Sequence, residues 1–126
     1  MNKLTTHVLD LVHGCPGRGI AIELYRLTSD EVQAEDSDTE WELVASDTTN
    51  FDGRCDQPLL EGDAFVKGCY EIVFQAGAYF DSWNDGQAEP KFLDAIVIRF
   101  GISDPTQHYH VPLLLSQYGY STYRGS

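Results

Sequence analysis

The stretch that decides the fold is Ile20-Ala-Ile-Glu-Leu-Tyr-Arg-Leu27, in which large apolar side chains recur at alternate positions. A period of two is typical of a β-strand that buries one face. The turn-forming cluster Gly14-Cys-Pro-Gly-Arg-Gly19 comes before it, and another apolar run, residues 6–12, comes before that cluster. This part of the sequence therefore predicts a strand, a turn and a second strand.

Short runs of the same kind continue along the chain. We expect further strands at residues 41–45, 68–75, 93–100, 108–115 and 119–123, and one short helix at residues 76–83. No window of a dozen residues carries the apolar stripe of an amphipathic helix. Seven to eight short strands, roughly ten residues apart, predict an all-β protein built as a two-sheet antiparallel β-sandwich.

Domain organisation and assembly follow from length and from one proline. The 126 residues contain no repeat, linker or low-complexity segment, so we expect a single domain over residues 1–126. Pro112 has no N–H for a β-ladder, which predicts that its strand lies at a sheet edge or contains a bulge. Because an edge strand can pair with another subunit, the sequence favours an oligomer.

The charge balance excludes some partners. Twenty acidic residues against eight basic ones give a net charge of −12, which repels phosphate backbones and anionic lipid headgroups. We therefore expect neither a nucleic acid nor a membrane as partner. The acidic segment at residues 30–47 lacks the residue order of a calcium-binding EF-hand loop, so we expect a solvated loop there.

The cysteines and the N-terminal residues indicate a compartment. Cys15, Cys55 and Cys69 are odd in number and irregularly spaced, so we interpret them as reduced thiols. The first residues contain no apolar run of signal-peptide length, and the chain contains no membrane-spanning stretch. These features predict a cytoplasmic protein.

Four histidines are candidates for chemistry. On a strand, His108 and His110 would point to the same face about 6.5–7 Å apart, a spacing that also occurs in zinc sites. His7, within an expected strand, is the only suggestive third ligand, and we favour an acid–base role over a metal site. A strand histidine taken alone is more often structural than catalytic, and we expect His13 beside its turn to be a surface residue. Arg54 could likewise be an ordinary turn arginine.

Three motifs together change this interpretation. They are Leu4-Thr-Thr-His-Val-Leu-Asp10, Asp52-Gly-Arg54, and His108-Tyr-His-Val-Pro-Leu-Leu-Leu-Ser116 followed by Tyr118-Gly-Tyr-Ser-Thr-Tyr-Arg-Gly-Ser126. Through them the chain strongly resembles the transthyretin-related family of 5-hydroxyisourate hydrolases over nearly its whole length. The related thyroid-hormone carriers share the Leu-Leu-Ser and Tyr-Ser-Thr framework but not the final Tyr-Arg-Gly-Ser. The chain departs from the family at Gln117, where many members have proline, and in its long acidic segment.

The resemblance implies a transthyretin (prealbumin)-like β-sandwich that assembles as a homotetramer, with active sites at the mouths of a central channel. It implies hydrolysis of the small molecule 5-hydroxyisourate to 2-oxo-4-hydroxy-4-carboxy-5-ureidoimidazoline in urate catabolism, with no metal or organic cofactor. The family's site residues match His7, Arg54, His110, Tyr123 and Ser126. We expect the first three and Ser126 to be catalytic, and His7, Arg54 and Tyr123 to contact the substrate.

A hydrolytic mechanism can be written for these residues. One imidazole, of His7 or His110, would deprotonate water while the other moves the proton onward, and Arg54 would stabilise the oxyanion. Tyr123 and Ser126 would close the pocket and orient the ring. Two alternatives stay open: a non-catalytic small-molecule carrier that uses the same channel, and a zinc-dependent hydrolase that uses His7, His108 and His110.

Overall fold

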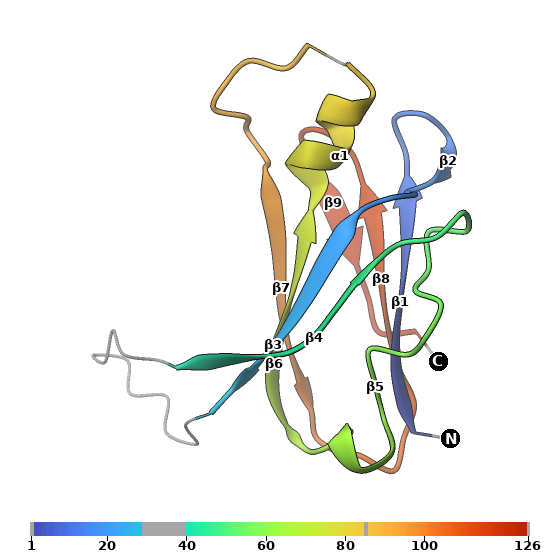
Figure 1. Ribbon diagram of the computed structural model, residues 1–126, viewed down its shortest axis with the longest axis vertical. Coiled ribbons are helices and arrows are strands. Elements are labelled where there is room, and N and C mark those ends of the chain that lie inside the picture. Colours follow the sequence, from blue (N-terminus) through green and yellow to red (C-terminus); the bar gives the residue numbers. More distant parts are fainter. Residues whose placement is uncertain (1, 29–39, 85, 126) are drawn as a thin grey trace.

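Two β-sheets packed face to face form the molecule (Figure 1). The computed structural model describes residues 2–28, 40–84 and 86–125. One sheet contains β1 (Lys3–Asp10), β2 (Cys15–Pro16), β5 (Leu60–Glu61), β8 (Tyr109–Leu115) and β9 (Tyr120–Thr122). Its order is β2-β1-β8-β9, with β5 also paired to β1. The other sheet has the order β4-β3-β6-β7, formed by Trp41–Thr48, Ala21–Leu27, Gly68–Gln75 and Ala95–Ile102.

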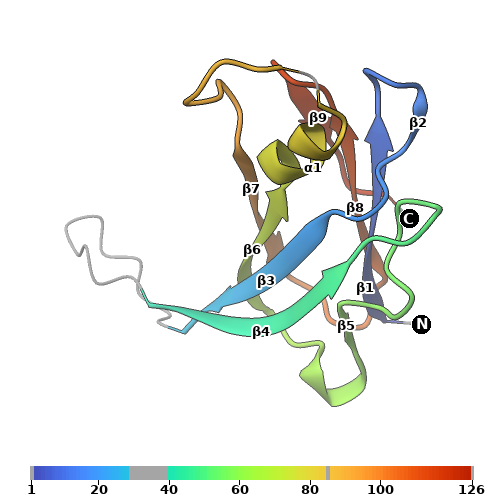
Figure 2. The same cartoon turned by 45° about the horizontal axis from the view of Figure 1, so that its top comes forward.

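Two short helices are found in the described part of the chain. The 3₁₀-helix η1 (Gly62–Ala64) precedes β6, and α1 (Ala76–Ser82) follows it directly. Figure 2 shows α1 at one end of the sandwich, where the chain crosses from β6 towards β7. The predicted helix at residues 76–83 is thereby confirmed, with Trp83 as its C-cap residue. No helix within the described ranges is long and apolar enough to cross a membrane.

The predicted sandwich is confirmed, with two differences in detail. The described residues contain nine strands, because β2 and β5 are two-residue strands within segments that read as turns or irregular chain. The pair β1–β8 runs parallel, whereas every other strand pair is antiparallel. Thr5 lies opposite His110 in this parallel register, and His7 lies opposite Pro112. The first and the penultimate strand are therefore neighbours.

The core lies between the sheets, which explains why apolar side chains recur at every second position along the strands. β1 buries Leu4, Thr6, Val8 and Asp10 and turns its intervening side chains outward. The largest side chains that are fully buried come from both sheets and from α1: Leu4, Ile20, Ile22, Leu24, Tyr70, Ile72, Phe74, Phe80, Ile96, Ile102, Leu113 and Leu115. Burial of this apolar surface is the main force that holds the two sheets together.

The prediction for Pro112 is wrong, because β8 lies between β1 and β9 and its ladders contain no register shift. The reason is the direction of its missing N–H. The carbonyl of Pro112 accepts from Thr122 Oγ1 (2.7 Å) and the carbonyl of His110 accepts from Gly125 N (2.7 Å). The N–H and C=O of one strand residue point to the same side, so the N–H that Pro112 lacks would have pointed towards the segment just after β9. The β8–β9 ladder ends at this point, so the proline leaves no ladder hydrogen bond unmade.

Candidate functional site

The candidate site lies on the outer face of the β1–β8 pair. Along β1, Thr5 and His7 alternate with buried residues and so point away from the core. On β8, His110 is half-buried between two buried neighbours and shares this outer face with Thr5. Alternation along two adjacent strands thus brings together side chains from the two ends of the sequence.

The turn at residues 50–54 is fixed against β1. Val8 N donates to the Gly53 carbonyl at 2.8 Å, and Arg54 forms an isolated antiparallel bridge with His7. Gly53 has φ +77°, and a Cβ there would lie 2.3 Å from the Val8 carbonyl oxygen, so only glycine fits. His7 Nε2 donates to the Asp52 carbonyl at 2.7 Å. His7 and Arg54 are therefore held side by side by backbone contacts.

A threonine hydroxyl lies between the two histidines of the His-x-His motif. Thr5 Oγ1 is 2.8 Å from His110 Nδ1 and 3.4 Å from His108 Nε2. This shared partner agrees with the expectation that His108 and His110 point to one face. Burial lowers the pKa of His110 below its ordinary value, and the charges of Arg54, His7 and His108 lower it further.

The C-terminal segment packs onto His110. Gly125 forms an isolated bridge with His110, and a Cβ on Gly125 would lie 2.7 Å from His110 Cδ2. Arg124 anchors this segment, because its Nη2 donates to Gln107 Oε1 at 3.0 Å and to the His108 carbonyl at 3.1 Å. The guanidinium also lies 4.1 Å from the centroid of the Tyr109 ring, within cation–π range.

Three of the five predicted site residues are thus brought together. His7 and Arg54 are adjacent, and both lie close enough to His110 to lower its pKa. Tyr123 is 60% exposed and lines a different hollow, next to Ile98 and Phe100 of the other sheet. Ser126 lies outside the described residues, so its predicted role and that of Tyr123 stay predictions.

A small hollow of about 150 Å³ opens beside these groups, lined by Thr5, Thr6, Arg54, Cys55, Gln57 and His108. Sequence reasoning missed Thr5 and Gln57. A threonine is ordinary in a strand, and its only signal was its position two residues before His7. Gln57 lies in irregular chain beyond Arg54 and gave no signal at all.

Cys55 follows Arg54, but its raised pKa disfavours the reactive thiolate form. Burial raises its pKa to about 12, and the nearby carboxylates of Asp47 and Asp56 act in the same direction. The neighbouring guanidinium therefore does not activate it, as expected for an inert thiol. Within residues 2–28, 40–84 and 86–125, no group of three or more His, Cys, Asp or Glu side chains is arranged to hold a metal ion.

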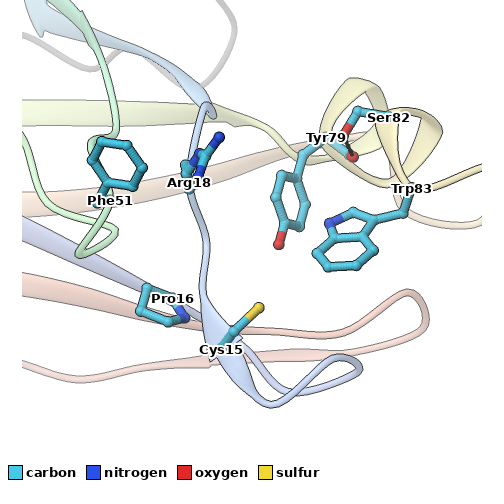
Figure 3. Close-up of a pocket in the computed structure, with 7 residues that line it drawn as sticks. All are labelled: Cys15, Pro16, Arg18, Phe51, Tyr79, Ser82 and Trp83. Carbon is cyan, nitrogen blue, oxygen red and sulfur yellow. Dashed lines mark hydrogen bonds between the residues drawn. The ribbon is translucent and has the colours of Figure 1, made fainter.

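A larger hollow, of about 520 Å³, lies elsewhere, between the β2 region and α1 (Figure 3). Arg18 and Phe51 form one side, and Tyr79 and Trp83 of the helical region form the other (Figure 3). The Arg18 guanidinium lies 4.5 Å from the centroid of the Phe51 ring. This hollow contains none of the five residues predicted for the site.

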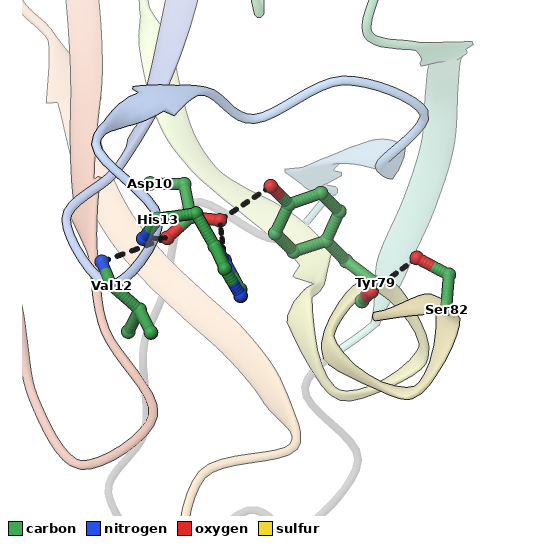
Figure 4. A network of polar contacts seen from close by, with 5 residues as sticks. All are labelled: Asp10, Val12, His13, Tyr79 and Ser82. Carbon is green, nitrogen blue, oxygen red and sulfur yellow. Dashed lines mark hydrogen bonds and ion pairs between the residues drawn. The ribbon is translucent and has the colours of Figure 1, made fainter. Parts of the chain in front are cut away.

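The expectation that His13 is a surface residue is wrong. Its Nδ1 lies 2.6 Å from Asp10 Oδ2, and its ring stacks on Trp83 with centroids 3.7 Å apart. Tyr79 OH donates to the same carboxylate oxygen at 2.6 Å, as Figure 4 shows. Burial raises the pKa of Asp10, but the hydrogen bonds from Tyr79 and His13 outweigh it and leave the pKa below its ordinary value. The network ties the end of β1 to α1.

Known proteins resemble the chain in sequence and in structure. The model of the HIUase/Transthyretin family matches residues 4–125. The 5-hydroxyisourate hydrolase of Pseudomonas aeruginosa is 54% identical over 126 residues, which are 100% of this chain and 93% of the relative. The solved structure of Klebsiella pneumoniae 5-hydroxyisourate hydrolase superposes with a TM-score of 0.77 at 28% identity, with 100% of both chains covered.

A solved structure of (S)-allantoin synthase superposes with a TM-score of 0.87 at 44% identity. The match covers 98% of this chain but only 43% of that one, so this fold is one part of a longer protein there.

Proposed function

The chain belongs to the HIUase/Transthyretin family, and on that basis we propose that it hydrolyses 5-hydroxyisourate to 2-oxo-4-hydroxy-4-carboxy-5-ureidoimidazoline. Relatives at 40–54% identity that span the full chain are 5-hydroxyisourate hydrolases, which supports a hydrolase. The observation in the fold that carries the proposal is the convergence of His7, Arg54 and His110 on one face of one sheet.

The proposed chemistry is addition of water to an acyl carbon, followed by cleavage of the ring C–N bond to give a carboxylate. Of the two histidines, we assign the base role to His110. Its lowered pKa keeps the imidazole neutral at pH 7, the form that can take a proton. In the neutral form of His7, Nε2–H is held by the Asp52 carbonyl, which leaves Nδ1 to pass a proton onward.

Arg54 has the role of oxyanion stabiliser in this proposal. Its guanidinium cannot deprotonate, and its planar fork can donate two hydrogen bonds to carbonyl or enolate oxygens of the substrate. In a chain of net charge −12, it also supplies a local positive potential at the hollow. Tyr123 and Ser126 would close the pocket over the bound ring.

The proposal includes a cytoplasmic homotetramer whose channel mouths hold the sites. Within one chain, Tyr123 does not line the small hollow beside Arg54, so in this proposal a neighbouring subunit completes the pocket. Several large apolar side chains are exposed, which favours contacts between subunits. No metal is part of the proposed mechanism.

Freshly generated 5-hydroxyisourate, followed by its ultraviolet absorbance, tests the proposal. Purified protein should accelerate decay far above the rate in buffer, and His110→Asn should lower the rate about 10²- to 10⁴-fold. Arg54→Lys should also impair turnover, because lysine lacks the planar guanidinium that can donate two hydrogen bonds to the substrate. Arg99→Lys on β7 should not change turnover. If 5-hydroxyisourate decays no faster with the protein than in buffer, the proposal that the protein is a hydrolase is wrong.

Two further measurements decide between the alternatives. Full activity after exhaustive chelation is the expected result and would exclude the zinc-dependent hydrolase. Saturable binding of iodinated phenols without any hydrolysis would instead favour the carrier.

A further inference from the structure

Thr5 has a position that none of the sequence motifs explained. Its hydroxyl joins strands β1 and β8, because it contacts the ring of His110, 105 residues away in sequence, at 2.8 Å. It also lies 3.4 Å from His108 Nε2 and lines the small hollow beside Arg54. A single hydroxyl therefore lies between two imidazoles at the proposed site.

The number of hydrogens allows two arrangements. A hydroxyl carries one hydrogen, and a neutral imidazole carries one hydrogen on either ring nitrogen. If Thr5 donates to His110 Nδ1, the ring hydrogen is on Nε2, and that nitrogen cannot take a proton. If His110 Nδ1–H donates to Thr5 Oγ1, Nε2 keeps its lone pair and can act as a base.

The role of His110 as base favours the second arrangement. Thr5 Oγ1 occupies Nδ1 at 2.8 Å, so Nε2 is the ring nitrogen left to meet a water molecule. A nitrogen that takes a proton from water needs a free lone pair, so the hydrogen of the neutral ring cannot be on Nε2. The ring nitrogen that faces Thr5 therefore carries the hydrogen. The Thr5 hydroxyl hydrogen is then free to point to His108 Nε2.

We propose that Thr5 is a positioning residue that holds His110 in its Nδ1–H tautomer and leaves Nε2 as the base. This inference rests on the proposed hydrolysis, in which His110 is the base. Two edges of the ring are held: Thr5 contacts Nδ1, and Gly125 packs against Cδ2. His108 completes the chain of hydrogen bonds as acceptor of the Thr5 hydroxyl.

The test compares Thr5→Val, which has the same shape without the hydroxyl, with Thr5→Ser, which keeps it. Nitrogen-15 NMR of the imidazoles reports the tautomer directly, whether or not the protein is active. We expect the Nδ1–H form of His110 in the wild type and in Thr5→Ser, and a mixture of tautomers in Thr5→Val. Thr48→Val, at an exposed threonine of β4 in the other sheet, is the matched control.

Kinetics give the second readout. Thr5→Val should lower kcat about 10- to 100-fold, as for other residues that orient a functional histidine, with KM nearly unchanged. Thr5→Ser should restore most of kcat, and Thr48→Val should not change it. If the wild type does not hydrolyse 5-hydroxyisourate, the proposed function fails, while the tautomer measurement still decides the role of Thr5.

Two outcomes would overturn the role of Thr5. One is a wild-type His110 in the Nε2–H tautomer, which needs no variant and so does not depend on whether Thr5→Val folds. The other is a Thr5→Ser variant as impaired as Thr5→Val, because the hydroxyl would then not be the group that matters.

Discussion

At the scale of single residues, the environment of His110 determines when it can act. Its pKa is lowered first by burial and then by the charges of Arg54, His7 and His108. A base works only when deprotonated, so a lowered pKa keeps the neutral form available further into acid. His110 is therefore suited to accept a proton at and below neutral pH.

This gives a prediction for the pH profile. The acid limb of kcat/KM should have its midpoint below the ordinary histidine value of about 6.5. Arg54→Met removes one cation that opposes protonation, so the pKa of His110 should rise and the limb should move to higher pH. The movement should be partial, because burial is the largest cause and remains.

The measurement is the rate at a series of pH values, together with an NMR titration of the His110 ring where residual activity is too low. Arg99→Met, at an exposed arginine of β7 that pairs with Glu71, is the control and should leave the limb in place. A limb that moves to lower pH in Arg54→Met would contradict the assignment of His110 as the base.

At the scale of elements, the segment after β9 acts through one close contact. A methyl group on Gly125 would lie 2.7 Å from His110 Cδ2 and 3.2 Å from its Cβ, so the ring or the segment must move. Gly125→Ala should lower kcat/KM about tenfold or more, since small misplacements of a catalytic group are costly. The free energy of unfolding should change little.

Gly119→Ala is the matched control in the same part of the chain, because its nearest neighbour would be Ser116 Oγ at 3.9 Å. Activity assays with chemical denaturation on both variants make the comparison. Equal activity of the two variants would show that close packing on His110 does not matter.

The contact between β1 and α1 is an element-scale feature of stability. Tyr79 OH donates to the buried carboxylate of Asp10, and a hydrogen bond to a charged group contributes about 1.5–3 kcal/mol. Tyr79→Phe should lower the free energy of unfolding by about that amount in urea titrations. Tyr25→Phe, which removes a bond to the more exposed Glu23, should cost less.

The same contact gives a pH dependence with a definite sign. The pKa of Asp10 is lower in the folded than in the unfolded chain, so the stabilisation is present above about pH 3.9. This stabilisation is lost as the pH falls through the pKa that Asp10 has in the folded chain. The difference between wild type and Tyr79→Phe should therefore shrink in acid, and a difference that grows there would refute this account.

How much was predictable differs between elements. Alternation located the long strands, and the helix after residue 75 was predicted, because a buried face imposes a period of two. The two-residue strands β2 and β5 were missed, since each is defined by its pairing with β1 and not by its own residues. The parallel pairing of β1 with β8 is a property of topology, which no local pattern contains.

The site was predictable in part. His7, Arg54 and His110 were found through their motifs, and the structure brings them together. Pro112 was misplaced because the sequence shows that an N–H is missing but not which way it would have pointed. His13 was misplaced because its partners, Asp10 and Trp83, meet it only in the folded chain.

The site should depend on the assembly of several chains. Leu11 is 60% exposed at the end of β1, and its N–H donates to the Leu115 carbonyl, so it extends the sheet that carries the site. Tyr118 is 69% exposed, and its ring contacts that of Phe92, which is also exposed. Apolar surface of this kind favours contacts between subunits.

Leu11→Asp should therefore yield a smaller species in analytical ultracentrifugation and a lower specific activity that falls further on dilution. Leu43 is exposed to a similar extent, 54%, but lies on β4 in the other sheet. Leu43→Asp should keep both the wild-type size and the wild-type rate. If both variants behave like the wild type, the exposed end of β1 is not an interface.

The parallel pairing of β1 with β8 also has a kinetic meaning. β1 comes more than a hundred residues before its long partner β8, so its ladder with β8 cannot form until the sandwich between them has been made. Contacts between such distant segments close late in folding. Recovery of turnover after refolding should thus lag behind burial of the β3–β6–β7 core, which makes catalysis a reporter of the final step of folding.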